Sequence, residues 1–232
     1  MTEIRIKIDS KDLMDLLSCA KLYNDEAKLT FADNRLTITD VDMTHVQMYD
    51  LSTVCEASEP CVIAVPLEKM IKALSATGDN IDIVIEDGIL TIRGDFAKVK
   101  VPLIGGEQTF KWPQKFTQPI ASCDIAPSLL APLVSYGKFT NASVAKFSIH
   151  DTRMTILIGE LPDLSEIQSP NTATGESTSM FSLEYIDTLL KHVKSVPTLT
   201  VSGFGDKFPM IFQWETERSK FKVCIAPWTE EE

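Results

Sequence analysis

The chain has 232 residues, of which 44% are hydrophobic, and its formal net charge at pH 7 is −11. This length allows one or two domains with sizeable cores, and the composition excludes wholesale disorder. Net charge alone argues against nucleic-acid binding, which needs Lys and Arg for phosphate contacts, although the placement of the charges matters more than their sum.

Targeting signals and cysteine motifs are absent from the sequence. No stretch approaches the ~20 apolar residues of a membrane span, and MTEIRIKIDS lacks the basic start and apolar core of a signal peptide. The five cysteines are scattered and form no C-x-x-C pair. We therefore expect an intracellular protein with free, buried thiols and without a disulfide framework or a zinc site.

Four amphipathic helices are predicted in chain order. The first begins at Ser10 with Asp9 or Ser10 as its cap, and the second has Pro66 at its first position. The third begins at Ala126 and contains Pro132, which predicts a short or kinked helix. The fourth follows Ser182 as its cap.

The helix starts indicate an internal repeat. The first and third starts are 116 residues apart, as are the second and fourth, and 116 is half of the chain length. Alternating runs such as AKLTFAD and RLTITDV lie between the helices and predict antiparallel strands. The sequence therefore predicts an α+β fold with two similar domains, each an antiparallel sheet with helices on one face.

The two halves meet at IGGEQTFKWPQKFTQP, residues 104–119, where Gly and Pro indicate a linker. We predict domains at 1–106 and 119–232 and a connecting linker at 107–118. Three aromatic residues lie in this stretch, namely Phe110, Trp112 and Phe116. They either seal the boundary between the halves or form an exposed apolar patch.

No motif of a common enzyme class is present, so we predict no catalytic residue and no cofactor. The acidic stretch TDVDMTHVQMYD offers Asp40, Asp42, His45 and Asp50 as oxygen and imidazole ligands. A solvated turn in which His45 is a partly buried polar anchor explains the same residues better, and we predict no metal site.

Several motifs, in order along the whole chain, resemble the proliferating cell nuclear antigen (PCNA) family and its archaeal members. They are His45-Val46 after DVDMT, VPLEKMIKAL, Gly159-Glu160-Leu161, FSLEYIDTLLK, FPMIFQW and the terminal KVCIAPWTEEE. The chain departs from the family pattern at Trp228, where Lys is common, and in its short SPNTATGES loop and nearly neutral third helix.

The resemblance implies a DNA sliding clamp, which is a six-domain ring of three subunits joined head to tail around duplex DNA. The implied partners are DNA polymerase, a clamp loader, and proteins of the flap endonuclease and ligase type, with no membrane. It implies a cytoplasmic location for an archaeal source and a nuclear one for a eukaryotic source. The alternatives are a subunit of a heterotrimeric or checkpoint-type clamp, and a structural oligomer that never meets DNA.

In the family the helices line the hole. Here the four helix segments carry a summed formal charge of +2, which leaves −13 for the rest of the chain. The resemblance implies that lysines of these helices face DNA, with Lys21, Lys72 and Lys191 as the best matches to basic family positions. The full candidate set is Lys11, Lys21, Lys69, Lys72, Lys138, Lys191 and Lys194.

Two further surfaces are implied by the resemblance. The subunit interface pairs an edge strand that holds Lys98, Val99, Lys100 and Val101 with one that holds Asp163, Leu164, Glu166 and Ile167. A groove for partner peptides, which carry a glutamine, an aliphatic anchor and two aromatic residues, is formed by Val41, His45, Val46, Phe110, Trp112, Pro209, Ile225, Ala226 and Pro227. Small Ala226 and donor-free Pro227 would leave nearby backbone open to an incoming chain.

Overall fold

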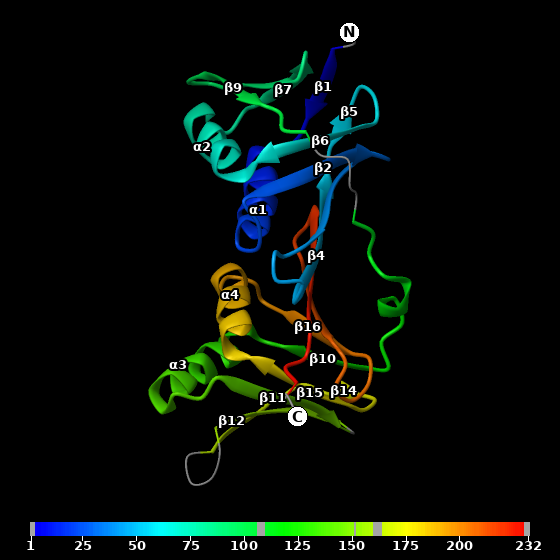
Figure 1. Ribbon diagram of the computed structural model, residues 1–232, viewed down its shortest axis with the longest axis vertical. Coiled ribbons are helices and arrows are strands. Elements are labelled where there is room, and N and C mark those ends of the chain that lie inside the picture. The colour runs from blue at the N-terminus through cyan, green and yellow to red at the C-terminus, as the bar shows by residue number, and fades with distance from the viewer. Residues whose placement is uncertain (1–2, 106–109, 151, 160–163, 230–232) are drawn as a thin grey trace. The chain divides into compact units, whose positions relative to one another are not determined.

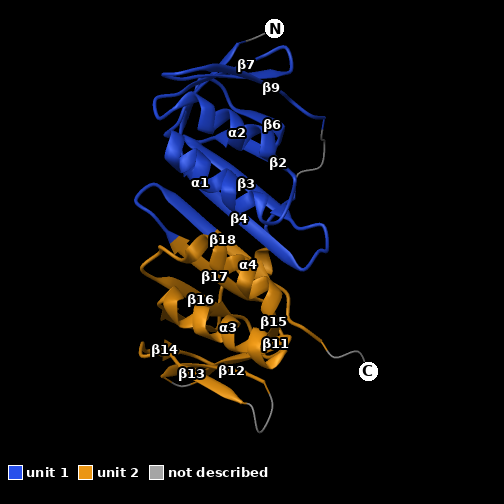
Figure 2. Ribbon diagram, turned by 90° about the vertical axis from the view of Figure 1, so that its left-hand side faces the viewer, with its two compact units in different colours: residues 1–112, 215–221 blue, residues 113–214, 222–232 orange. Residues whose placement is uncertain are grey.

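The computed structural model describes residues 3–105, 110–150, 152–159 and 164–229. The chain forms two compact units (Figure 2), of which one contains Met1–Trp112 and Glu215–Phe221 and the other contains Pro113–Trp214 and Lys222–Glu232. We call them the first and the second unit.

The first unit alternates strands with two helices. Its elements are β1 (Ile4–Lys7), α1 (Ser10–Lys21), β2 (Glu26–Ala32), β3 (Arg35–Val41), β4 (Gln47–Val54), β5 (Glu56–Ala57), β6 (Cys61–Pro66), α2 (Leu67–Thr77), β7 (Asp82–Glu86), β8 (Ile89–Arg93) and β9 (Lys98–Pro102). Both helices lie on the same side of the strands (Figure 1).

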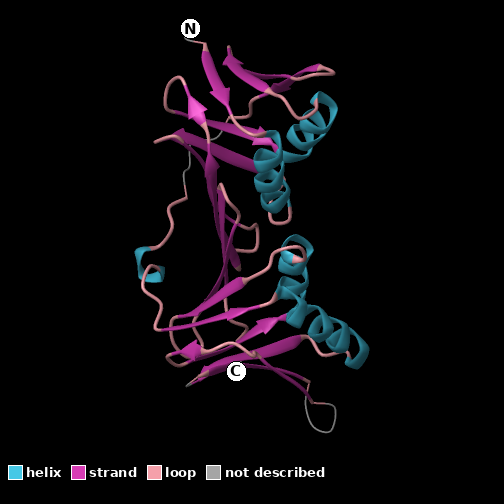
Figure 3. Cartoon of the chain, turned by 180° about the vertical axis from the view of Figure 1, so that it is seen from behind, coloured by secondary structure: helices cyan, strands magenta, loops and turns pink. Residues whose placement is uncertain are grey.

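The second unit and the end of the chain contain the remaining elements. They are the 3-10 turns η1 (Gln114–Phe116) and η2 (Pro127–Leu129), with β10 (Ala121–Ile125), α3 (Leu130–Thr140), β11 (Val144–His150), β12 (Arg153–Ile158), β13 (Ser165–Gln168), β14 (Ala173–Thr174), β15 (Ser177–Ser182), α4 (Leu183–Val193), β16 (Leu199–Gly203), β17 (Met210–Glu215) and β18 (Ser219–Ile225). Helices α3 and α4 pack against each other, as α1 and α2 do in the first unit (Figure 3).

The strand order repeats, element for element, in the two halves of the chain. The order β5-β1-β7-β8-β9 has its counterpart in β14-β10-β16-β17-β18, and β6-β2-β3-β4 has its counterpart in β15-β11-β12-β13. Neighbouring strands pair antiparallel, as β1 does with β7, β3 with β4, β10 with β16 and β11 with β12. The predicted α+β class and internal repeat are therefore confirmed.

Strand alternation builds the core of each unit, because successive side chains point to opposite faces. In β2 every second residue, including Leu29 and Phe31, is buried. The second unit buries a cluster of Phe147, Phe181 and Phe212, whose rings meet edge to face at centroid distances of 5.5, 6.0 and 6.4 Å. Such aromatic residues remove large apolar areas from water and favour this arrangement of rings.

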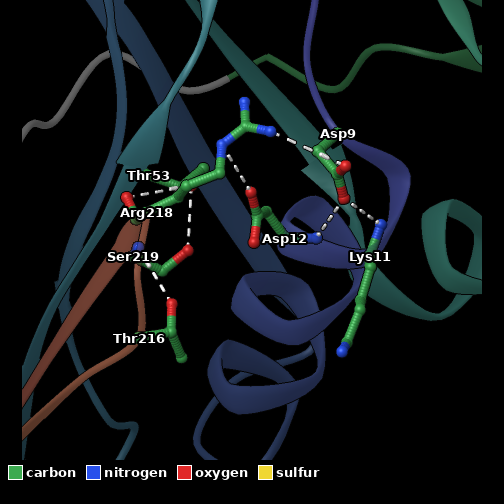
Figure 4. A network of polar contacts seen from close by, with 7 residues as sticks. All are labelled: Asp9, Lys11, Asp12, Thr53, Thr216, Arg218 and Ser219. Carbon is green, nitrogen blue, oxygen red and sulfur yellow. Dashed lines mark hydrogen bonds and ion pairs between the residues drawn. The ribbon is translucent and has the colours of Figure 1, made fainter.

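Helix α1 begins at the predicted cap. Asp9 Oδ1 accepts hydrogen bonds from the backbone N–H groups of Lys11 and Asp12 at 2.9 and 3.1 Å, which satisfies two donors of the first turn. Arg218, from the segment before β18, lies against the same turn (Figure 4), with its Nε 3.2 Å from Asp12 Oδ2. Burial and the nearby charge of Asp9 raise the pKa of Asp12, and the charge of Arg218 opposes this rise.

The first residues of β18 belong to the first unit and lie beside β4. There Ser219 Oγ donates a hydrogen bond to Thr53 Oγ1 at 2.8 Å, and both residues are buried (Figure 4). This polar contact fixes the start of β18 at the edge of β4.

The third helix begins later than predicted. Residues 127–129 form the turn η2, and α3 starts at Leu130, so that Pro132 lies in the first turn of the helix. The first four N–H groups of a helix have no partner within the helix, so proline at this position removes no hydrogen bond. The prediction of a helix start at Ala126 was wrong by one turn, because Pro132 helps to begin this helix.

The cysteines are buried, except for Cys61, which is half-buried. Burial raises the pKa of every one of these thiols, that of Cys55 to about 11 and that of Cys224 to about 12. Within the described ranges, no helix combines the length and the apolar content that crossing a membrane requires.

Candidate functional site

The candidate DNA-facing lysines of the first unit fall into two groups. Lys11 and Lys69 are exposed, and the structure gives their ammonium groups no ion pair among the described residues. Lys21, the last residue of α1, forms an ion pair with Asp25 in the segment after the helix, and Lys72 forms one with Glu68, its i,i+4 neighbour on the surface of α2. The hydrogen bond and charge of Lys72 lower the pKa of Glu68.

The second unit shows the same division. Lys138 of α3 contacts Asp187 of α4, with Nζ 2.9 Å from Oδ2, whereas Lys191 and Lys194 are exposed at the end of α4. The two paired lysines of the first unit and Lys138 therefore already have carboxylate partners. A DNA phosphate that binds any of these three would compete with an intramolecular acid.

The turn after β3 depends on Asp42, which is 7% exposed. Its Oδ1 accepts hydrogen bonds from the N–H groups of Val46 and Gln47 at 2.8 and 2.9 Å, and its Oδ2 accepts one from the Thr44 hydroxyl. His45 is exposed and adopts a left-handed backbone with φ 58°. The prediction of His45 as the partly buried anchor was wrong, since the acceptor-rich carboxylate of Asp42 has this role.

The other acids of this stretch are also engaged locally. Asp40 Oδ1 accepts from the N–H of Val41 at 2.8 Å, and Asp50 Oδ1 accepts from the Thr39 hydroxyl at 2.7 Å. Among the described residues, no group of three or more His, Cys, Asp or Glu side chains has the arrangement of a metal site.

The linker aromatics have different surroundings. Phe116 is buried in the second unit and meets Phe204 edge to face at a centroid distance of 5.4 Å. Phe110 and Trp112 belong to the first unit and are half-buried, and Phe110 lines a cavity over β2 and β3. Phe116 thus has a packing role, while Phe110 and Trp112 present part of their surface to solvent.

The remaining groove candidates lie in both units. Val41, His45 and Val46 belong to the first unit, at the end of β3 and in the turn after it. In the second unit Ile225 is buried at the end of β18, and Pro209, Ala226 and Pro227 are half-buried. The groove assignment remains a prediction.

Trp228 is held by its backbone. Its N–H donates to the carbonyl of Met180 in β15 at 2.7 Å, and the residue is 40% exposed. This bond holds the chain against β15 at Trp228, whose side chain remains partly in solvent. Residues 230–232 lie outside the described part.

The two candidate interface strands end their sheets. Strand β9 is the last in its order, with exposed Lys98 and Lys100, half-buried Val99 and buried Val101. Strand β13 is the last in its own, with Glu166 exposed and Ile167 half-buried, and Leu164, just before it, is 41% exposed. Asp163 lies outside the described residues. Each strand has one paired neighbour among the strands described.

Sequence reasoning missed Lys28 and Arg35, which line the cavity beside Phe110. The alternation in AKLTFA places Lys28 on the face of β2 opposite to the core, but such a residue is ordinary in a surface strand. Only the presence of Phe110 in the lining of the same cavity distinguishes Lys28.

The comparisons with known proteins concern the whole chain. No protein-family model matches the sequence, and no curated protein is significantly similar to it. Among solved structures, PCNA of A. fulgidus, determined with the C-terminal region of FEN-1 bound, has 19% sequence identity and a TM-score of 0.85, and the alignment covers 99% of this chain and 100% of that chain. PCNA of Thermococcus kodakaraensis has 14% identity and a TM-score of 0.81, with 98% and 100% covered.

A third similar structure is the PCNA2–PCNA3 complex of Sulfolobus tokodaii, with 16% identity, a TM-score of 0.77 and coverage of 99% and 100%. These identities are low, and the similarity lies in the arrangement of the elements. Along nearly its whole length, the chain has the two-domain α+β fold of the PCNA sliding clamps, as the motifs in its sequence implied.

Proposed function

We propose that this protein is a DNA sliding clamp without catalytic activity of its own. Three copies join head to tail into a closed ring that encircles duplex DNA and tethers polymerase and other replication and repair enzymes. The observation that carries this proposal is the match of fold over 99% of this chain and 100% of the A. fulgidus clamp, with a TM-score of 0.85.

The internal repeat supports head-to-tail closure. In the strand correspondence, β9 is the counterpart of β18, and β13 is the counterpart of β4. Strand β18 pairs with β4 within the chain, whereas β9 and β13 both end their sheets. If β9 of one copy paired with β13 of the next, the same strand pair would form again between subunits. Heterologous contacts of this kind close into rings, and the pairing covers two exposed edges.

The charges of the helices suit loose contact with DNA. Exposed lysines attract phosphates without reading bases, and such contacts weaken as salt is added. Acid partners at Lys21, Lys72 and Lys138 reduce the net attraction. A ring that must slide benefits from contacts that are weak and replaceable.

The test is polymerase synthesis on primed circular DNA in the presence of a clamp loader. We expect Lys21→Ala, Lys72→Ala and Lys191→Ala together to reduce loading or processivity several-fold at low salt, with a smaller effect at high salt. The control combines Lys7→Ala, Lys146→Ala and Lys207→Ala, three exposed lysines outside the helices. Equal stimulation by the helix variant and the parent protein at low salt would refute DNA contact through these helices.

The second candidate is one subunit of a heterotrimeric clamp. The PCNA2–PCNA3 complex among the similar structures favours it, because two different chains of this fold associate there. In this case the same edge strands would pair with a relative instead of an identical copy.

The partner surface is part of the same proposal. The similar clamp of A. fulgidus was determined with the C-terminal region of FEN-1 bound, and we propose that peptides of this kind bind the groove formed by Val41, His45 and Val46 with the linker and the end of β18. Apolar walls would hold the aromatic anchors, which dominate the affinity of such contacts. Calorimetry with a Q-x-x-(aliphatic)-x-x-(aromatic)-(aromatic) peptide tests this, and a folded trimer carrying Val46→Glu and Ala226→Glu should lose the binding.

A further inference from the structure

The cavity beside Phe110 has the chemistry of an oxyanion site. It has a volume of about 350 Å³ and is lined by residues of β2 and β3 and by Phe110 of the linker. Two cationic side chains, Lys28 and Arg35, line it together with Thr30, Thr37 and Thr39. This is the face of the sheet opposite to the buried Leu29 and Phe31.

The ammonium group of Lys28 is in an unusual position. Its Nζ is inaccessible to solvent and has no hydrogen-bond partner among the described residues, although the residue as a whole is only half-buried. Lysine usually covers its aliphatic stem and keeps the ammonium in water. A cation removed from water without a partner is costly, so this group favours any anion that reaches it.

Other donors surround the same space. Thr30 and Thr37 are direct partners across β2 and β3, so their side chains lie next to each other. Arg35 is oriented by a hydrogen bond from its guanidinium to Ser52 Oγ at 2.9 Å. Asp33 is the one carboxylate among the described lining residues, which leaves an excess of positive charge at the site. A carboxylate ligand would find an ammonium, a guanidinium and two hydroxyl groups.

The cavity shares strand β3 and Phe110 with the proposed peptide groove. Thr37, Thr39 and Val41 alternate along one face of β3, and Val41 is a groove residue. Phe110 belongs to both sets. A peptide anchored at Val41 and Val46 therefore has the Lys28 cavity within reach of its flanking residues.

We infer that the Lys28 cavity binds an acidic side chain of the partner peptide, next to the glutamine and aromatic anchors. This inference rests on the proposed function. The flexible stem of Lys28 turns its ammonium toward the carboxylate. The charge-assisted hydrogen bond that forms gives Lys28 Nζ the partner that it lacks among the described residues of the free protein.

The experiment compares peptides by calorimetry on the full-length protein. The first pair of peptides differs after the aromatic residues of the motif, where one peptide has two glutamates and its twin has two glutamines. The second pair differs in the same way before the first residue of the motif. The chain has a net charge of −11, so general electrostatics disfavour the acidic peptides. We expect at least one glutamate peptide to bind about tenfold more tightly than its glutamine twin, which is the effect of about one charge-assisted hydrogen bond.

The variants separate this site from general charge effects. Lys28→Met keeps the length of the side chain and removes its charge, and it should abolish the glutamate preference. Lys146→Met removes an equal charge from an exposed position on β11 and should keep the preference. A titration with inorganic phosphate, followed by the NMR amide signals of Thr30 and Thr37, should give saturable shifts in the parent protein and none in Lys28→Met.

The outcomes are distinct for the two proposals. Equal binding of glutamate and glutamine peptides would overturn the inference and leave the peptide groove intact. Failure of all peptides to bind would overturn the groove and the inference with it. A glutamate preference that survives Lys28→Met would show that the acid is bound elsewhere.

Discussion

Asp42 shows how one buried carboxylate shapes the turn that carries two residues of the proposed peptide groove. Its three acceptor contacts hold residues 42–47 in a turn that presents His45 and Val46. A buried N–H group that loses its acceptor costs about 1–3 kcal/mol. The carboxylate of Asp42 therefore has a structural role in the turn, although Asp and His are residue types that can also bind metals.

We predict that Asp42→Ala lowers the free energy of unfolding by about 1–3 kcal/mol, because two backbone N–H groups lose their acceptor. Urea denaturation measures this change. The variant should also weaken the peptide binding proposed for His45 and Val46. Asp40→Ala is the control, since Asp40 accepts, among the described residues, from the adjacent Val41 N–H alone, and an equal loss in both variants would contradict the role assigned to Asp42.

Glu68 competes with DNA for Lys72 in the proposed function. Lys72 lowers the pKa of Glu68, so this acid is favoured in its charged form and remains ionised at neutral pH. We predict that Glu68→Gln tightens binding to DNA by a few-fold and steepens the salt dependence, because the free lysine can meet a phosphate.

The control for this variant is Glu184→Gln. Glu184 is likewise exposed in the first turn of a helix, α4, and no described lysine pairs with it. Fluorescence anisotropy with duplex DNA measures both affinities. An equal gain from both substitutions would assign the effect to net charge alone.

At the scale of elements, the two edge strands carry the strongest prediction. Strand β9 places Lys98 and Lys100 on its exposed side, and β13 exposes Glu166. Opposite charges on paired strands favour one register. We predict that Lys98→Glu with Lys100→Glu shifts a trimer toward monomer in gel filtration.

The matched double variant is Lys7→Glu with Lys146→Glu. Lys7 lies in β1, which has neighbours on both sides, and Lys146 lies in β11, which also does. This variant changes the net charge by the same amount without touching either edge, so it should remain trimeric. An unchanged trimer in the β9 variant would show that this strand is not the interface.

The helices show which elements could be predicted from the sequence alone. Apolar spacing was enough for α1, α2 and α4, because each buries one stripe of side chains. It misplaced the start of α3, because proline both breaks helices and begins them, and only the backbone of residues 127–129 decides which. The role proposed for Lys28 was hidden for a similar reason, since Phe110, which lines the same cavity, is distant in sequence.

At the scale of the whole molecule, the charge is unevenly divided. Exposed lysines lie on α1 at Lys11, on α2 at Lys69 and at the end of α4 at Lys191 and Lys194, while the chain as a whole has a net charge of −11. In the proposed ring only one part of the surface would face DNA, so the net charge of the chain says little about nucleic-acid binding.

We predict that the purified chain has three times its monomer mass of 25.8 kDa in native mass spectrometry. Head-to-tail pairing of two edges that differ from each other closes only in a ring of copies. A monomer that assembles only when a related chain is added would instead support the heterotrimeric alternative. A dimer with two-fold symmetry would contradict both.

The raised pKa values of the cysteines have a practical consequence for observing the proposed ring on DNA. The thiolate is the form that reacts with maleimide dyes, and the raised pKa of all five thiols keeps that form scarce at neutral pH. A single Glu59→Cys substitution, in the exposed loop between β5 and β6, would therefore take up a fluorophore selectively. Because the native cysteines would remain largely unlabelled, one dye per subunit could report loading and diffusion along DNA by single-molecule imaging.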